Sequence, residues 1–89
     1  MRIKNIFKKE KTEREAINRI IWDPSLHLED FEIVFLSRIH GKELEERVNV
    51  SEIEVVGDFF NIKGRNAKIP FHRVRKILFR GRIVWERSR

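Results

Sequence analysis

The sequence contains no cysteine, so it can form no disulfide framework, no thiolate nucleophile and no cysteine-ligated zinc site. Its four glycines stand singly, which excludes a glycine-rich loop that cradles phosphates. No apolar run approaches the roughly 20 residues of a membrane span, and residues 1–11 are too highly charged for a signal peptide. We therefore expect a cytoplasmic protein that makes no contact with a membrane.

Catalytic motifs are absent as well. The three histidines, His27, His40 and His72, have neither the His-x-x-His spacing of metal sites nor the His-x-Ser/Thr pair of two-histidine phosphoesterases. We expect no metal, no cofactor and no catalytic residue, and hence a protein that is not an enzyme. One alternative stays open, because two histidines brought together by the fold could act as general acid and base on RNA.

Acidic residues are scarce in only one part of the chain. Residues 58–89 contain ten lysines and arginines and two acids, a local net charge of +8, whereas residues 1–57 contain ten basic and twelve acidic residues. The whole chain has a net charge of +6 and a pI of about 10.2. A basic region with aromatic residues in a small domain indicates a polyanionic partner, most directly a nucleic acid. The alternative is a basic surface without a binding role.

The length of 89 residues suffices for one domain with one hydrophobic core. We expect a single domain over residues 1–89, with its core at residues 12–88. Residues 1–11, which carry four lysines and one arginine, form either a basic arm or an extension of the first helix.

The first helix is predicted to begin at a capping box, Thr12–Glu15, in which a hydroxyl and a carboxylate satisfy reciprocal backbone donors. It should end before Pro24, because the residue that precedes a proline is driven out of the helical conformation. One apolar face follows the cap at helical spacing: Ala16, Ile17, Ile20 and Ile21.

The rest of the chain has the patterns of β-strands. Residues 31–39 alternate, which places Phe31, Ile33 and Phe35 on one face, and a turn at 40–42 leads into a second strand. The further strands are expected at 43–48, 59–62, 67–70, 76–79 and 82–86, with turns at 63–66 and 80–81.

Two similar apolar spacings each indicate a short turn that buries apolar residues ahead of a strand. They are Val50, Ile53 and Val56 in one case and Phe71, Val74 and Ile77 in the other. The predicted class is α+β: an N-terminal helix packed on an antiparallel sheet of about five or six short strands, with a C-terminal β-hairpin.

Candidate phosphate-binding residues occur in the basic region, where arginine outnumbers lysine and its guanidinium matches phosphate oxygens in bidentate fashion. His72, Arg73 and Arg75 follow Pro70 closely, where a turn could present them together. On an extended strand the two arginines would share a face while Val74 points inward. Arg80 and Arg82 add charge at the tip of the last hairpin. The alternatives are that His72 is a structural turn residue and that the arginines pair with acids of the first half.

Trp85 and Trp22 are candidates for stacking on a base or a ribose. Both also have a structural reading. Trp85 alternates with Ile83 and Trp22 follows an apolar helix face, and either pattern is typical of core residues.

Three stretches of the chain together resemble one small-domain family. Residues 69–74 read IPFHRV and residues 84–87 read VWER, after the Arg80–Gly81 turn, and residues 17–24 read INRIIWDP. Over residues 16–88 the sequence is similar to the archaeal, uncharacterised DUF504/UPF0248 family, the MJ1316-type RNA cyclic group end recognition domain. The resemblance implies recognition of RNA ends that carry a 2′,3′-cyclic phosphate.

The matching polar positions are Trp22, Asp23, His72, Arg73, Trp85 and Arg87. Where the central strand of the family tends to carry an Asp-Arg pair, this sequence has Ser37 and Arg38, so the resemblance implies a role for Arg38 and none for an acid at position 37.

We therefore expect a non-enzymatic RNA-binding domain that recognises 3′ ends in RNA processing or repair, with an RNA-processing enzyme as a further partner. The first candidates for contact with the RNA phosphate are His72, Arg73 and Arg87. Three alternatives stay open. One is a nucleic-acid-binding accessory protein without end specificity, the second is a cyclic-phosphate or RNA hydrolase, and the third is a protein-interaction module that pairs through a sheet edge.

Overall fold

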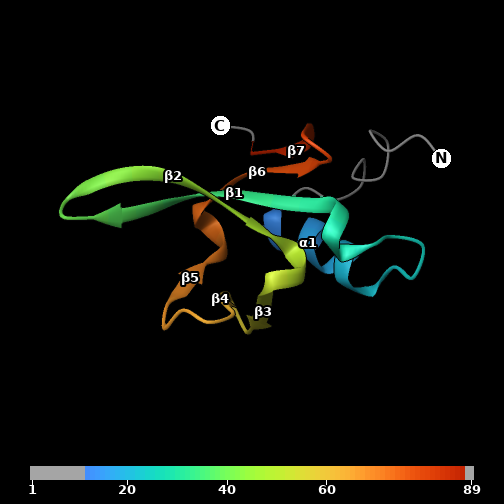
Figure 1. Cartoon of the computed structure of the whole chain (residues 1–89), viewed down its shortest axis with the longest axis horizontal. Helices are drawn as coiled ribbons and strands as arrows, with labels where there is room; N and C mark the ends of the chain where they lie inside the picture. Colours follow the sequence, from blue (N-terminus) through green and yellow to red (C-terminus); the bar gives the residue numbers. More distant parts are fainter. Residues whose placement is uncertain (1–11, 88–89) are drawn as a thin grey trace.

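The computed structural model describes residues 12–87, which form one α-helix, three 3-10 turns and seven strands (Figure 1). In chain order the elements are α1 (Glu13–Trp22), η2 (Leu28–Asp30), β1 (Phe31–Ile39), β2 (Lys42–Asn49), η3 (Val50–Glu52), β3 (Ile53–Val56), β4 (Phe59–Ile62), β5 (Lys68–Pro70), η4 (Phe71–Arg73), β6 (Val74–Phe79) and β7 (Arg82–Glu86). The predicted α+β class is confirmed. The expected arm or helix extension at residues 1–11 lies outside the described residues, and a single domain over the whole chain stays a prediction.

The expected single sheet of five or six strands was wrong. Within residues 12–87 there are two antiparallel sheets, one with the order β2-β1-β6-β7 and one with the order β3-β4-β5. The chain enters the second sheet through η3 and leaves it through η4, and these are the two short turns that the apolar spacings predict. Val50 and Phe71, the first residues of these turns, are buried, whereas Val56 is 46% exposed because alternation along β3 turns it outward.

Helix α1 has the predicted start and apolar face. The backbone N–H of Glu15 donates to the Thr12 hydroxyl at 3.1 Å, and the Thr12 N–H donates to the Glu15 carboxylate at 3.2 Å. Ala16, Ile17 and Ile20 are fully buried, and the helix ends at Trp22, ahead of Pro24. No helix among residues 12–87 has the length and apolar character to cross a membrane.

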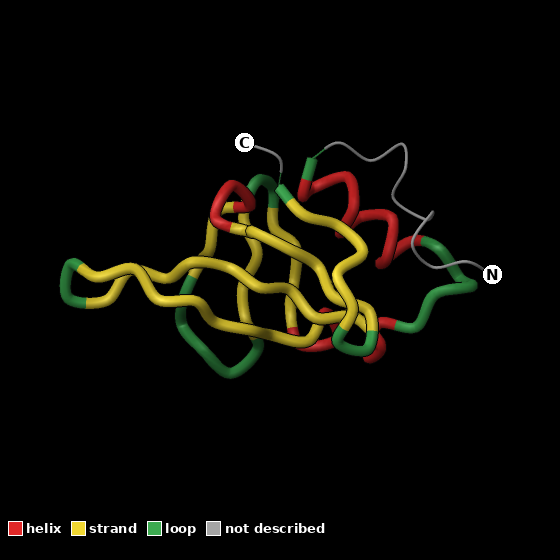
Figure 2. The backbone as a smooth tube through the Cα atoms, turned by 90° about the horizontal axis from the view of Figure 1, so that it is seen from above, coloured by secondary structure: helices red, strands yellow, loops and turns green. Residues whose placement is uncertain are grey.

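Two hairpins shape the larger sheet. His40–Gly41 joins β1 to β2 and Arg80–Gly81 joins β6 to β7, and in both turns the two residues have positive φ, with Gly41 at 77° and Gly81 at 88°. Such a two-residue turn matches the twist of paired strands, and a glycine adopts it without steric cost. The β1–β2 hairpin projects beyond the rest of the molecule (Figure 2).

The hydrophobic core lies where α1 and the small sheet cover one side of the larger sheet (Figure 1). Phe35 of β1 meets Phe60 of β4 edge to face, with ring centroids 5.7 Å apart, and Phe60 also contacts Phe71 of η4 at 5.7 Å. Such aromatic pairs contribute roughly 0.5–1.5 kcal/mol each beyond the area that they bury. They therefore fix the small sheet and η4 against the larger sheet.

Two β-bulges interrupt the pairing of β6. Val34 pairs with Lys76 but Phe35 pairs with Val74, so Arg75 has no partner on β1. Likewise Ile77 pairs with Trp85 but Leu78 pairs with Ile83, which leaves an extra residue on β7. The second bulge breaks the expected alternation, and Trp85 is 8% exposed whereas Ile83 is 50% exposed.

Candidate nucleic-acid interface

The pairing of β1 with β6 ends at Phe35 and Val74, and beyond this point β1 pairs with β2 alone. A small cavity of about 180 Å³ opens where η4 and the start of β6 diverge from β1. We call it the arginine cleft, and its lining residues are Leu36, Arg38, Glu43, His72, Arg73 and Arg75.

The cleft brings together four of the residues that the sequence singled out: His72, Arg73, Arg75 and Arg38. The turn expected after Pro70 is η4, whereas an extended strand does not account for the grouping. Arg73 belongs to the η4 turn, and Arg75 is the bulged residue of β6, while Val74 between them is fully buried. A bulge re-aims the side chain that it carries, so the turn and the bulge together place the two arginines at one cavity.

Charge in the cleft is only partly balanced. Arg38 donates to the Glu43 carboxylate at 3.2 Å, and this hydrogen bond spans the β1–β2 hairpin. Within residues 12–87, neither Arg73 nor Arg75 makes a side-chain hydrogen bond or an ion pair. Two guanidinium groups are therefore available to an anion, and they present their donors in the planar geometry that suits phosphate oxygens.

The η4 turn that carries His72 and Arg73 is held on two sides. Phe71 is 5% exposed and packs into the core, and its backbone N–H donates to the Asp58 carbonyl of the small sheet at 3.2 Å. Arg87, just beyond β7, donates from Nη2 to the His72 carbonyl at 2.7 Å and from Nε to the Val74 carbonyl at 3.2 Å. The backbone at the cleft is therefore fixed.

Arg87, which the sequence offered as a candidate for contact with RNA, has partners within the protein. Its guanidinium also pairs with Glu13 of α1, so both Nε and Nη2 are engaged within the protein. The alternative reading, in which an arginine of the basic region pairs with an acid of the first half, is the one that the geometry supports. Arg87 positions the cleft and does not line it.

Arg80 and Arg82 lie at the β6–β7 turn, outside the arginine cleft. Arg80 donates to both oxygens of Asp30, at 3.3 and 3.4 Å, and stacks over the Phe79 ring with its Cζ 5.2 Å from the ring centroid. Arg82 is exposed. The structure therefore does not bring this pair together with His72 and Arg73.

The two tryptophans do not lie together at one stacking site. Trp85 is 8% exposed and belongs to the hydrophobic core, so its ring has little surface left for a base. Trp22 is 79% exposed, but it lies at the end of α1 and lines neither the cleft nor the cavities beside it.

One aromatic residue near the cleft escaped the sequence argument. Phe59 is 41% exposed on the outer face of β4, and with Pro70 it lines a cavity of about 400 Å³ that also includes His72. We call these two apolar residues the apolar shelf. Alternation supplies the missing signal, since Phe60 points into the core and Phe59 must then point outward.

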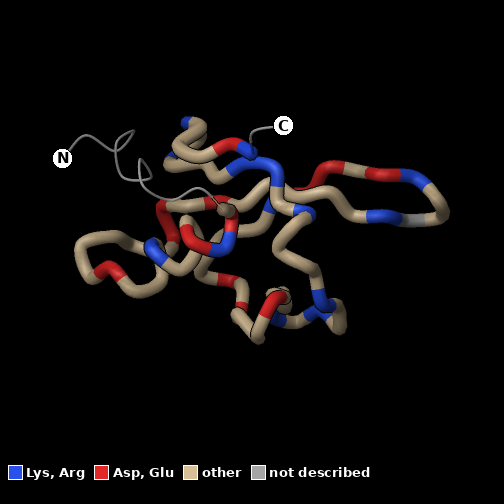
Figure 3. Tube along the Cα trace, turned by 180° about the vertical axis from the view of Figure 1, so that it is seen from behind, with Lys and Arg blue, Asp and Glu red and all other residues tan. Residues whose placement is uncertain are grey.

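The surface beside the cleft is rich in lysine and arginine, which occur in the η4 region and again along the β4–β5 loop (Figure 3). Among residues 12–87 no group of three or more histidines, aspartates or glutamates is placed to hold a metal ion. Basic and aromatic groups around a concave surface are the features of an anion or nucleic-acid site.

Comparison with known proteins supports the resemblance seen in the sequence. The family model described as the MJ1316 RNA cyclic group end recognition domain matches residues 3–87. The chain is 31% identical over 64 residues to the UPF0248 protein MJ1316 of Methanocaldococcus jannaschii, covering 72% of this chain and 76% of that protein. It is 30% identical over 77 residues to a UPF0248 protein of Metallosphaera sedula, covering 86% of this chain and 94% of that protein. No solved structure matches the chain significantly.

Proposed function

The chain belongs to the family of MJ1316 RNA cyclic group end recognition domains, and from this premise we propose that it binds RNA 3′ ends carrying a 2′,3′-cyclic phosphate in the arginine cleft. One observation supports the proposal most directly. Three guanidinium groups and one imidazole line a cavity of about 180 Å³, and two of the guanidinium groups have no partner among residues 12–87.

Charge alone would select the wrong RNA end. A cyclic phosphate is a monoanion, whereas a linear terminal phosphate carries about −1.5 to −2 near neutral pH, by analogy with phosphorylated side chains. A cleft that prefers the cyclic end must therefore combine a limited positive charge with a close fit. Glu43 meets the first requirement, since it neutralises Arg38 and would repel a dianion more strongly than a monoanion.

The proposal gives each lining residue a role. Arg73 and Arg75 donate to the two non-bridging oxygens, and His72 contributes one further hydrogen bond. Leu36 of the cleft forms an apolar wall for the ribose. Trp85, which the sequence offered for stacking on a ribose, is 8% exposed and belongs to the core, as does Phe71 at 5%.

The apolar shelf extends the proposed site to the terminal base. Phe59 is part of the same cavity lining as His72, which itself also lines the cleft. A base stacked on an aromatic ring gains roughly 1–3 kcal/mol without regard to its sequence. The shelf would therefore add affinity for a terminal nucleotide but little preference among bases.

The test is fluorescence anisotropy with one short RNA made with a cyclic phosphate, a linear phosphate or a hydroxyl at its 3′ end, at two salt concentrations. We expect at least a tenfold preference for the cyclic end, about 1.4 kcal/mol, that persists at the higher salt. The variant Arg73→Gln should lose the preference for the cyclic end. The variant Lys42→Gln, which removes an equal charge at the tip of the projecting hairpin, should keep that preference.

Equal affinity for the three RNAs, falling together with salt, would leave only a basic surface and would overturn end recognition. Each RNA is also checked for intactness, since loss of the cyclic phosphate during incubation would indicate a hydrolase. We further propose that the protein acts in the cytoplasm in RNA processing or repair, next to an enzyme whose reaction makes or consumes cyclic ends.

A further inference from the structure

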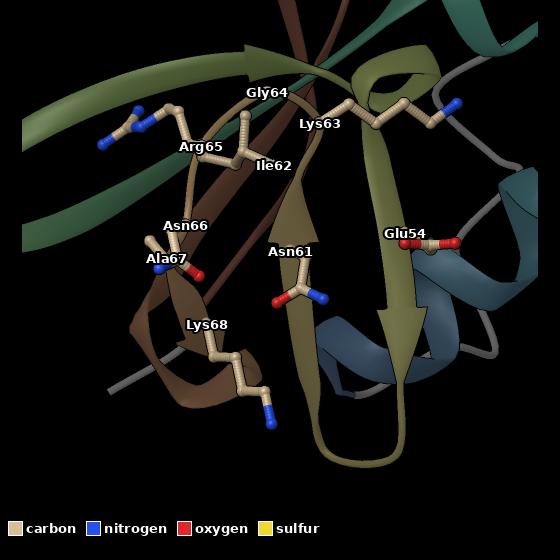
Figure 4. A pocket seen from close by; sticks show the side chains of 9 residues that line it. All are labelled: Glu54, Asn61, Ile62, Lys63, Gly64, Arg65, Asn66, Ala67 and Lys68. Carbon is tan, nitrogen blue, oxygen red and sulfur yellow. The ribbon is translucent and has the colours of Figure 1, made fainter.

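The arginine cleft is one end of a longer concave surface. A cavity of about 360 Å³ shares Leu36, Arg38 and Arg73 with the cleft. A third cavity, of about 400 Å³, lies along the β4–β5 loop and shares Arg65, Ala67 and Lys68 with the second (Figure 4). Because each cavity shares lining residues with the next, the three follow one another. We call the second and third cavities the loop trough.

The loop trough is positively charged along its length. Lys68 lies where its two cavities join, and it makes no ion pair within residues 12–87. Lys63 donates to the Ser51 carbonyl at 3.3 Å, a contact that leaves its charge uncompensated. Arg65 donates from one nitrogen to Glu46 at 3.0 Å, and its half-exposed side chain lines both trough cavities.

The floor of the third cavity is polar, and the strand pairing of the small sheet arranges its side chains. Glu54, Asn61 and Lys68 pair across β3, β4 and β5, so their side chains form one row on the outer face (Figure 4). Asn66 lines the same cavity from the loop. Amide side chains carry both donors and acceptors, as do the edges of unpaired bases, which are the parts of single-stranded RNA that proteins read.

We propose that the loop trough binds the nucleotides that precede the 3′ end, as a single strand running from the arginine cleft along the β4–β5 loop. The inference rests on the proposed function, because a 3′ end held in the cleft leaves the RNA only its 5′ side along which to continue. Both trough cavities fall within the roughly 300–1,000 Å³ of small-ligand sites. That volume suits single nucleotides better than a duplex.

The experiment measures affinity against RNA length. RNAs of two, four and six nucleotides, all with a cyclic 3′ end, are titrated by anisotropy with the full chain, and the six-nucleotide RNA is also made with a linear phosphate. We expect affinity to rise at least tenfold from two to six nucleotides. Lys68→Gln should weaken the binding of the six-nucleotide RNA about threefold or more. It should also reduce the salt slope of binding by about 0.7 log units, the value for one phosphate on a single strand.

Lys42→Gln is the matched control, because Lys42 lines none of the three cavities. Neither variant should change the affinity of the two-nucleotide RNA or the ratio of cyclic to linear ends. No gain with length, or equal losses in the two variants, would overturn the trough while end recognition stands. Equal affinity of the unaltered protein for the cyclic and linear six-nucleotide RNAs would overturn the proposed function itself, and the trough with it.

Discussion

The guanidinium of Arg87 donates to the backbone carbonyl of His72 over 2.7 Å, so a residue beyond the last strand fixes the turn that carries the cleft. The same side chain reaches the Val74 carbonyl and pairs with Glu13 of α1. Arg87 thereby joins the chain after β7, the η4 turn and the helix. Arg87 should therefore affect RNA binding indirectly, by fixing the geometry of the η4 turn.

Replacing Arg87 with lysine should destabilise the protein, because an ammonium keeps the charge but cannot offer a planar fork to several acceptors. We expect a loss of about 1.5–3 kcal/mol in the free energy of unfolding, the range for hydrogen bonds that involve charged groups. Urea unfolding followed by circular dichroism measures it. A variant as stable as the unaltered protein that has nevertheless lost RNA affinity would show that Arg87 contacts RNA directly.

In contrast to the Arg87 variant, Arg73→Gln and Arg75→Gln should weaken RNA binding without destabilising the protein. Neither side chain has a partner among residues 12–87, so unfolding free energy should change by no more than about 0.5 kcal/mol. Binding of a cyclic-ended RNA should weaken, and the double variant should lower the salt slope by about 0.7 log units, because both arginines contact the same singly charged phosphate. Anisotropy at several salt concentrations checks this, and an unchanged slope would remove both residues from the interface.

Sequence patterns predicted the features that depend on neighbours in the chain. The capping box at Thr12–Glu15 and the strand at Phe31–Ile39 have the predicted bounds, and the Arg80–Gly81 turn connects the expected strands. Each follows from a rule that acts within a few residues, such as reciprocal capping or the positive φ of a tight turn. Clustering of His72, Arg73 and Arg75 was predictable for the same reason.

Features that depend on distant contacts could not be predicted in this way. The division into two sheets depends on how Phe60 packs between Phe35 and Phe71, and residue spacing does not encode that packing. The pairing of Arg87 with Glu13 joins residues 74 positions apart. The bulge at Arg75 is visible only in the strand register, so the sequence indicated a turn after Pro70 but not the bulge beside it.

The tryptophans offer a direct test of which aromatic residues are free to stack. In a Trp22→Phe variant the remaining indole, Trp85, is 8% exposed and should emit at the short wavelengths of a buried tryptophan. Addition of a cyclic-ended RNA should leave that emission unchanged, while Phe59→Ala should weaken binding by about 1–3 kcal/mol if the terminal base stacks on the shelf. Quenching of the Trp85 emission by RNA would show that Trp85 does contact the RNA.

Glu46, a residue of the loop trough, should make the stability of the fold depend on pH. The Ser37 hydroxyl, and then the Arg65 guanidinium, hold the pKa of Glu46 below its ordinary value of 4.5. A lowered pKa means that the ionised form stabilises the fold above pH 4.5 and that this contribution is lost as the pH falls through the lowered value. NMR titration of the carboxyl carbon should give a midpoint below 4.5 that rises in Ser37→Ala and in Arg65→Gln. A midpoint insensitive to both changes would contradict the pairing.

Glu43 is the residue whose removal should alter end preference most selectively. It lines the arginine cleft and pairs with Arg38, so Glu43→Gln raises the positive charge of the cleft and should strengthen binding of every phosphorylated end. The gain should be larger for a linear phosphate, because a dianion is repelled more strongly by the carboxylate than a monoanion.

Charge interactions at exposed sites are worth roughly 0.2–1 kcal/mol, so the preference for the cyclic end should fall by about 1.4- to fivefold in Glu43→Gln. Parallel anisotropy titrations of the cyclic and linear RNAs give the ratio, and Glu45→Gln, on the same strand but outside the cleft lining, controls for the loss of an acid. If both variants change the ratio equally, long-range charge sets the preference. A change confined to Glu43→Gln assigns the discrimination to the cleft itself.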